Sequence, residues 1–167
     1  MRQGGGVDVS SSLPEPVLPT PELALLTALW EVWQALTVLG EADLRARHDL
    51  DLRAFLVLAY VQGGTDQPAR LAHKLGLPRY EVSRVLRALE RRGAVMRGHA
   101  RPDGRRVVVT VTPHGRALWE DALATVRGVT GPPLAALGLR AGSLTRDLHA
   151  LAQAIQPSLS SSTQETP

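Results

Sequence analysis

The sequence predicts a mainly α-helical protein with one small β-hairpin, arranged as a winged helix-turn-helix between helices at both ends of the chain. Three observations favour this fold class. Apolar residues recur at helical spacing through most of the chain, a glycine separates two short helical segments near its middle, and a Pro-Asp-Gly turn precedes a run of β-branched residues. At 167 residues there is room for one domain with flexible ends.

Composition excludes several classes of protein. Hydrophobic residues make up 44% of the chain, which is enough for a packed core. Cysteine is absent, so disulfides, thiol-based redox sensing and cysteine-ligated metals are excluded. No uninterrupted apolar run approaches the roughly 20 residues of a membrane helix, and the N-terminus lacks the apolar centre of a signal peptide. We therefore expect a cytoplasmic protein without a membrane partner.

Positive charge is concentrated in one segment. Between Asp66 and Arg106 there are eleven Lys and Arg residues and four acidic residues, whereas the rest of the chain has eight basic and twelve acidic residues. Solubility alone would not separate the charges in this way. A basic segment inside a neutral-to-acidic chain indicates a polyanionic partner.

The two ends are rich in Gly, Ser and Pro, which predicts a disordered arm over residues 1–19 and a disordered tail over 157–167. The first helix is expected within 20–48, because Thr20 can cap it and Pro21 suits its first position. It carries two apolar stripes, where one would suffice to dock it on its own domain. The second stripe favours contact with an identical subunit. The alternative is a helix central to its own domain.

A helix-turn-helix is predicted after this segment. A helix over about 51–62 ends at a Gly-Gly pair, and a short helix over 68–75 is broken by Gly76. The next helix, over 79–92, has an apolar stripe with spacing i, i+3, i+4, i+7. Its other side carries the polar and basic residues Arg79, Tyr80, Ser83, Arg84, Arg87 and Arg91. In this motif the second helix can lie in the major groove of DNA.

A β-hairpin follows, with strands over about 94–99 and 106–112. A hairpin directly after a helix-turn-helix is a wing, and its tip carries Arg101, Asp103, Arg105 and Arg106. Such a tip can reach the DNA backbone or the minor groove. Residues 49–113 are thus expected to form a DNA-binding lobe. Two further helices, over about 114–127 and 141–155, form a second flanking segment, 114–156, which we expect to dimerise together with 20–48.

These motifs resemble the MarR (multiple antibiotic resistance regulator) family of winged-helix transcription factors, over about residues 20–156. The family pattern Asp-x-Arg, strand, Thr-x-x-Gly corresponds here to Asp103-Gly-Arg105 and Thr112-Pro-His-Gly115. LAHKLGLPRYEVSRVLRALERRGAV is similar to the family's helix-turn-helix, including Val82-Ser83-Arg84 and Arg92-Gly93. The two halves at this spacing are more specific than either alone.

The resemblance implies a homodimer that binds a pseudo-palindromic double-stranded operator, usually as a repressor, and that small aromatic or phenolic compounds release. By the same resemblance Arg105 would enter the minor groove, Asp103 would orient it, and Ser83, Arg84 and Arg87 would face the major groove. Two positions depart from the pattern. Pro78 replaces the hydroxyl residue that often caps the recognition helix, and Leu56, after Phe55, replaces the acidic residue of urate-responsive members, so a urate-type pocket is not favoured.

Other candidate sites have two readings each. Trp30 and Trp33 can stack on an aromatic effector or anchor a dimer interface, and we favour the interface. Arg53, beside Phe55, can pair with a ligand carboxylate or be a solvated arginine, and we favour the latter. The cluster His48, Asp49 and Asp51 contains metal-ligand types, but neighbours in a loop seldom all face one ion. We expect no metal and no cofactor.

The sequence contains no Gly-x-Ser-x-Gly, His-Glu-x-x-His or phosphate-loop motif, so we do not expect an enzyme. Two alternatives to a ligand-gated regulator stay open. One is a winged-helix DNA-binding protein without ligand gating, constitutive or architectural. The other is a winged helix used for protein contacts alone, which the basic segment argues against.

Overall fold

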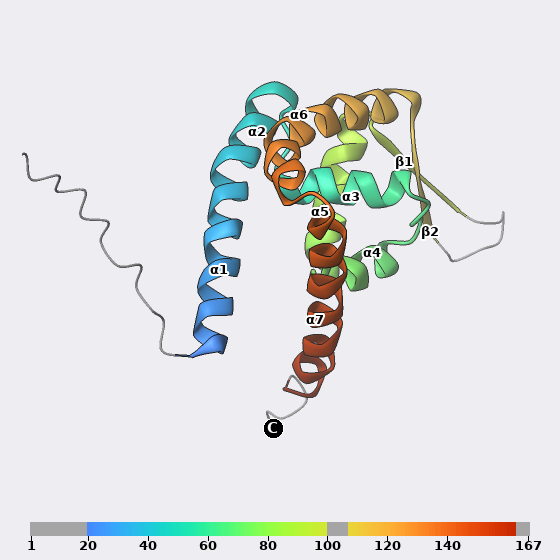
Figure 1. Ribbon diagram of the computed structural model, residues 1–167. Helices are drawn as coiled ribbons and strands as arrows, with labels where there is room; N and C mark the ends of the chain where they lie inside the picture. Colours follow the sequence, from blue (N-terminus) through green and yellow to red (C-terminus); the bar gives the residue numbers. More distant parts are fainter. Residues whose placement is uncertain (1–19, 100–106, 163–167) are drawn as a thin grey trace, which may run out of the picture. The chain divides into compact units, whose positions relative to one another are not determined.

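The computed structural model describes residues 20–99 and 107–162. The expected N-terminal arm, the tip of the wing and the last residues of the chain lie outside the described residues. Within them the chain is mainly helical, with one antiparallel hairpin of β1 (Val95–His99) and β2 (Val107–Val111) (Figure 1). The prediction of a winged helix-turn-helix with helices on either side of it in the sequence is confirmed.

The N-terminal helical stretch consists of α1 (Pro21–Ala35), a π-helical turn η1 (Leu36–Gly40) and α2 (Glu41–His48). The predicted cap is present, because the Leu23 amide donates to Thr20 Oγ1 at 3.3 Å. The chain divides between Gln34 and Ala35 into two compact units, and nearly all of α1 belongs to the first. No residue of α1 is buried, although leucines, valine and two tryptophans line it.

The N-terminal helical stretch is long and apolar on average, although no uninterrupted apolar run in it approaches 20 residues. Pro21–His48 is a helix of 28 residues, and an 18-residue window within it has a mean hydropathy of 1.4. Single polar residues interrupt its apolar residues at short intervals. The mean hydropathy is therefore high, although the stretch contains no long uninterrupted apolar run. By length and composition alone this described helix could cross a bilayer. An exposed apolar face that another protein covers has the same composition.

Three helices make up the helix-turn-helix part: α3 (Leu52–Gln62), α4 (Pro68–Leu75) and α5 (Arg79–Arg91). Asp51 begins α3 as its cap, with Oδ1 accepting from the Ala54 amide at 2.7 Å. Gly76 ends α4 in the left-handed region, with φ of 61°, which glycine adopts without steric cost. Pro78 precedes α5 and gives its first turn no side-chain hydrogen bond, as the departure from the family pattern predicts.

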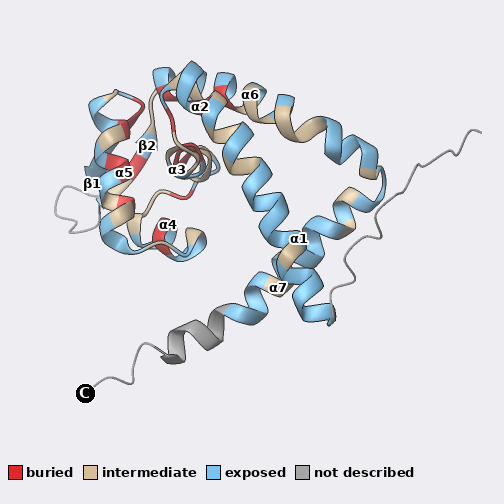
Figure 2. Cartoon of the chain, turned by 90° about the vertical axis from the view of Figure 1, so that its left-hand side faces the viewer, coloured by how far each residue is buried: buried red, intermediate tan, exposed pale blue. Residues whose placement is uncertain are grey.

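The core lies mainly in this lobe and extends into the segments on either side of it. Among the described residues the buried hydrophobic ones fall between Leu44 and Ala122, and α5 contributes its whole predicted apolar stripe to them: Val82, Val85, Leu86 and Leu89. Figure 2 shows the buried segments gathered on α3, α4, α5 and the hairpin stem. Burying side chains of this size contributes about 1.5–3 kcal/mol each. The recognition helix is therefore held by its inner face.

The hairpin stem is fixed to the lobe along both edges of β2. Val95 pairs with Val111 and His99 with Val107 on the β1 side. On the other side the Val109 amide donates to the carbonyl of Asp66, just before α4, at 2.7 Å. Val109 is buried. The base of the wing is thus part of the folded lobe.

The Thr-x-x-Gly motif joins the end of the hairpin to α6 (Pro113–Leu137). Thr112 caps α6, with Oγ1 accepting from the Gly115 amide at 2.9 Å and donating to the Gly93 carbonyl at 2.6 Å. Gly115 packs directly on the backbone of Ala94, and a Cβ placed there would lie 1.8 Å from the Ala94 carbonyl oxygen. Both motif residues therefore serve one junction, between α6 and the turn after α5.

The C-terminal helices are longer than predicted. We expected the first to end near residue 127, with interruptions at Gly128 and at 131–133, but α6 continues through Pro132 and Pro133 to Leu137. A proline inside a helix removes one backbone hydrogen bond and crowds the preceding turn, but it does not end α6 here. After Gly138, α7 (Arg140–Ser162) extends beyond the expected end near residue 155 and into the segment expected as a tail.

Candidate nucleic-acid interface

The side of α5 opposite the core carries the residues predicted to face DNA. Arg79, Tyr80, Arg84, Arg87 and Arg91 are exposed and Ser83 is half-buried. The helical period produces this division, because positions that alternate with the buried stripe must point away from it. The result is a row of basic side chains along the second helix of a helix-turn-helix.

The arginines of the lobe fall into two groups. Among the residues that the structure describes, Arg79, Arg84 and Arg91 have no acidic partner within ion-pair distance, and Arg87 donates only to the Ser83 carbonyl of its own helix, at 3.2 Å. Arg53 on α3, Arg97 on β1 and Arg92 at the end of α5 are instead bonded to partners inside the lobe, whereas Arg70 on α4 is exposed and has no acidic partner among the described residues. Since exposed, unpaired guanidinium groups are available to phosphates and base edges, the first group forms the candidate interface.

Two committed arginines hold α5 from outside. Arg53, on α3, pairs with Glu81 in the first turn of α5, with Nη1 and Oε2 at 3.0 Å. Arg97, on β1, lies 3.3 Å from a Glu90 carboxylate oxygen and donates to the Ser83 carbonyl at 3.2 Å. Each pair is partly exposed and contributes little stability on its own. Together they tie both ends of the recognition helix to neighbouring elements.

The predicted wing residues Arg101, Asp103, Arg105 and Arg106 lie outside the described residues. The stem that carries them is described, and β1 packs against α5. A cavity of about 320 Å³ lies where the base of the wing meets the recognition helix, lined by Gln67, Pro68, Ala69, Arg79, Ser83 and Val107. The helix and the stem of the wing thus border the same hollow.

A second cavity, of about 400 Å³, lies between the start of α3 and the outer side of α5. Three of the predicted contact residues line it, with an aspartate and small apolar side chains: Arg84, Arg87, Arg91, Asp51, Ala54, Val85 and Ala88. Its volume falls within the range of small-molecule sites. Three guanidinium groups around one hollow favour an anionic occupant.

The four residues suggested for an effector pocket lie in different settings. Trp30 and Trp33 are 60% and 54% exposed on α1. Phe55 is buried in the core of the lobe, and Arg53 is paired with Glu81. None of the four lines either of the two cavities described above.

Two of the three residues considered for a metal have side-chain hydrogen bonds to neighbouring groups. The ring Nε2 of His48 lies 2.7 Å from Thr125 Oγ1 on α6, and Asp51 caps α3. Asp49 occupies the left-handed region, with φ of 50°, at the end of α2. These positions are explained by helix capping and packing.

Arg92 and Arg97 were not among the predicted site residues, although both contact elements next to the interface. Arg92 appeared only as half of the Arg-Gly pair of the family pattern. A usable signal was present, because a basic residue at the end of a helix often binds nearby carbonyl groups. No sequence pattern indicated which carbonyls Arg92 would reach.

Comparison with known proteins agrees with this geometry. Residues 48–106 match the model of the MarR family. The crystal structure of the MarR family protein Rv2887 from Mycobacterium tuberculosis in complex with DNA is 31% identical, with a TM-score of 0.59, over 76% of this chain and 96% of that chain. Its complex with salicylic acid is also 31% identical, with a TM-score of 0.59, over 76% of this chain and 95% of that chain.

A more distant likeness is to the transcriptional regulator BldR from Sulfolobus solfataricus. The two are 20% identical over 80% of this chain and 96% of that chain, with a TM-score of 0.72, which shows a shared fold. No curated protein matches the chain in sequence.

Proposed function

Since this chain belongs to the MarR family of transcriptional regulators, we propose that it acts as a homodimeric repressor that binds a pseudo-palindromic operator and is released by a small aromatic or phenolic ligand. The recognition helix α5 would enter the major groove with Arg79, Tyr80, Ser83, Arg84, Arg87 and Arg91. The wing would contact the neighbouring minor groove or backbone with Arg101, Asp103, Arg105 and Arg106.

The unpaired arginine row on the exposed side of α5 is the observation that carries DNA binding. The structure gives these side chains no acidic partner among the described residues, while it pairs Arg53, Arg92 and Arg97 with groups inside the lobe. A fold that only needed solubility would not separate its arginines in this way. The relative Rv2887, which is known in complex with DNA, supports the same reading.

The exposed apolar side of α1 supports dimerisation. Leu26, Trp30 and Trp33 are each more than half exposed, and aromatic residues are enriched in the centres of protein interfaces. A twofold dimer would present two recognition helices to half-sites about 34–36 Å apart, one turn of DNA. This spacing is what a pseudo-palindromic operator requires.

Ligand release is supported by two facts. Rv2887 is known in complex with salicylic acid, and the cavity lined by Arg84, Arg87 and Arg91 would suit an aromatic carboxylate. A ligand there would occupy the guanidinium groups that we assign to DNA. Ligand and DNA would then compete for the same side chains, so the ligand would lower the apparent affinity for the operator.

One observation favours the alternative of a DNA-binding protein without ligand gating. Phe55 is part of the core and Arg53 is paired with Glu81. Two of the residues suggested for an effector pocket therefore already have structural contacts within the lobe. The two functions differ only in the response of DNA binding to small aromatic acids.

A fluorescence-anisotropy titration separates these functions. The full chain is titrated onto a duplex from the DNA upstream of its own gene and onto a scrambled duplex, at several salt concentrations, with and without salicylate. The proposal predicts selective binding that salicylate weakens. Selective binding that is indifferent to salicylate and to other aromatic acids would support the alternative. Equal binding to both duplexes across all upstream fragments would contradict sequence-specific regulation.

A further inference from the structure

Arg92, the residue directly after α5, faces away from the row of exposed arginines on that helix. It is the C-cap of α5, and its side chain is 30% exposed. Nη2 donates to the carbonyl of His48 at 2.7 Å, and Nη1 donates to the carbonyl of Asp49 at 2.5 Å. The guanidinium therefore bonds two consecutive backbone carbonyls at the end of α2. We call this arrangement the Arg92 fork.

The position of the fork follows from how α2 ends. The last carbonyls of any helix have no partner within the helix. At this end the amides of Asp49 and Leu50 bond back to Arg45 and Leu44, and Asp49 takes a left-handed conformation. The carbonyls of His48 and Asp49 are left for Arg92. Charged donors to carbonyls form stronger hydrogen bonds than neutral donors, and a cation also suits the negative end of the helix dipole.

The backbone contacts, and not the neighbouring carboxylate, make up the fork. Asp49 Oδ2 lies 3.8 Å from Nη1, and the Asp49 side chain is 94% exposed. An ion pair so open to water contributes little. Arg92 thus bonds to the main chain at this corner. Replacing the side chain of Asp49 would leave both carbonyl acceptors in place.

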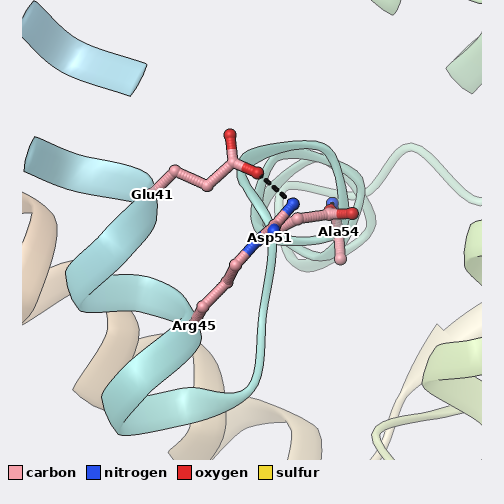
Figure 3. A network of polar contacts seen from close by, with 4 residues as sticks. All are labelled: Glu41, Arg45, Asp51 and Ala54. Carbon is pink, nitrogen blue, oxygen red and sulfur yellow. Dashed lines mark hydrogen bonds and ion pairs between the residues drawn. The ribbon is translucent and has the colours of Figure 1, made fainter. Parts of the chain in front are cut away.

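The corner that Arg92 holds joins α2 to α3. Leu50 is buried in the core and Asp51 caps α3 through the Ala54 amide. On α2 itself Glu41 and Arg45 form an ion pair at 2.6 Å (Figure 3). Because the link between the helices is only three residues, 49–51, and its central residue is buried, its carbonyls are held in a fixed place.

His48 extends the connection to α6. Its carbonyl accepts from Arg92, while its ring Nε2 lies 2.7 Å from Thr125 Oγ1 on α6. One residue of α2 therefore contacts the end of the recognition helix through its backbone and the long C-terminal helix through its side chain. This polar connection runs from α5 through α2 to α6.

We infer that Arg92 is a positioning residue for DNA recognition: its fork fixes the C-terminal end of α5 against the α2–α3 corner, and through His48 and Thr125 against α6. The inference rests on the proposed function. Arg92 would not contact DNA itself, because both terminal nitrogens donate inward. Loss of the fork would let α5 adopt a wider range of tilts about its buried stripe in the free protein, so that ordering the helix on the operator would cost free energy while each arginine still reached its DNA contact.

The test compares Arg92→Met, Arg92→Lys and Arg87→Met in the full chain. Methionine keeps the length of the stem and loses both hydrogen bonds, whereas lysine keeps the charge and can bond one carbonyl at a time. Arg87 is on the proposed DNA face, and among the described residues its side chain hydrogen-bonds only within its own helix. Operator affinity is measured by anisotropy over a salt series, at a temperature where thermal melting shows that every variant is folded.

We expect Arg92→Met to bind the operator roughly tenfold more weakly, within the range of coupling carried by such contacts. Its log–log salt slope should equal that of the wild type. Arg92→Lys should recover part of the affinity. Arg87→Met should lose affinity and have a slope smaller by about 0.9, the value for one lost phosphate contact. A role in stability alone would lower the melting temperature and leave the affinity of the folded protein unchanged.

Three results would overturn the inference. Wild-type affinity in Arg92→Met would mean that the fork does not position α5. A slope reduced as in Arg87→Met would mean that Arg92 contacts a phosphate directly. If Arg92→Met is unfolded at the assay temperature, Arg92→Lys takes its place. Wild-type affinity in folded Arg92→Lys would then mean that the two-bond fork does not position α5. A wild-type chain that does not prefer any upstream duplex to a scrambled one would instead refute the proposed function, and the two failures are therefore distinguishable.

Discussion

The winged-helix lobe and the helix α1 differ in how far their apolar side chains are buried. In the lobe, short amphipathic helices and a hairpin stem enclose a shared core in which Leu50, Leu58, Leu71 and Leu86 are fully buried. In α1 no residue is buried, and Leu26 and Trp30 remain 63% and 60% exposed. The lobe has the packing of a unit that folds alone. The helix α1 exposes an apolar face of the kind that a second protein chain covers.

This difference separates two kinds of function in one chain. A self-contained lobe can hold a recognition helix at fixed geometry, which sequence reading of DNA demands. A helix with an uncovered apolar face gives the chain a means of pairing with a second copy. Mutations in the two regions should therefore change different measurements, folding in one and association in the other.

Gly115→Ala should produce the largest effect, by breaking the lobe. The new Cβ would overlap the Ala94 carbonyl oxygen, and neither backbone can move without opening the junction of α6 and β1. We expect a loss of about 3 kcal/mol or more in the free energy of unfolding, measured by chemical denaturation. Gly128→Ala is the matched control, because it lies in the same helix with open space around it and should stabilise by up to about 1 kcal/mol. Equal stability of the two variants would disprove this account of the motif.

Leu26→Glu combined with Trp30→Glu should abolish pairing and leave the lobe folded. A charge in the centre of an apolar interface opposes association, and central aromatic residues often account for about 2 kcal/mol or more of binding. We expect a monomer by sedimentation velocity, with the cooperative unfolding of the lobe retained. Glu31→Ala, on the same helix, is the control. A double variant that still sediments with the wild type would place the interface elsewhere.

Arg84→Met should weaken operator binding without changing association or folding. Arg84 is exposed on the recognition helix, and a base contact would cost about 1–3 kcal/mol and relax specificity at one position. The measurement is anisotropy on a set of single-base operator variants. Arg146→Met removes one charge from α7, where the side chain bonds only its own helix, and should bind as the wild type. A uniform loss across all operator variants would assign Arg84 to a phosphate instead.

Arg53→Met should have the smallest effect. The Arg53–Glu81 pair is 55% and 19% exposed, so its contribution to the stability of the lobe should be only about 0.2–1 kcal/mol. Thermal unfolding with and without salicylate checks this and also tests the ligand reading of Arg53. If the variant lost a ligand-induced rise in melting temperature that the wild type shows, the arginine would be a ligand contact after all.

The regular parts of this molecule could be predicted because local signals fixed them. Pro68 and Gly76 mark both ends of α4, and Thr20 and Asp51 each cap a helix as hydroxyl and carboxylate residues do. The apolar stripe of α5 gave its buried face, and therefore the exposed face, residue by residue. These assignments need only the types of residue at the helix ends and the period of the helix.

The remaining features depend on contacts between distant segments. The helix expected to end near residue 127 continues through Pro132 and Pro133 to Leu137. Nothing near Phe55 in the sequence distinguishes a core ring from a ligand-binding ring, because that depends on which helices cover it. The partners of Arg53, Arg92 and Arg97 lie 28, 44 and 14 positions away, beyond the reach of any local pattern.

The contact between Gly115 and Ala94 has a consequence for how this chain can vary. The obstructing atoms belong to the main chain, which every amino acid shares, so no exchange at position 94 can make room for a side chain at position 115. Second-site suppressors of a Gly115 variant should therefore never map to its contact partner. They would have to shift an entire helix. We therefore expect position 115 to tolerate no residue other than glycine. Gly128 and Gly131, in the same helix, have open space around them and should tolerate substitution.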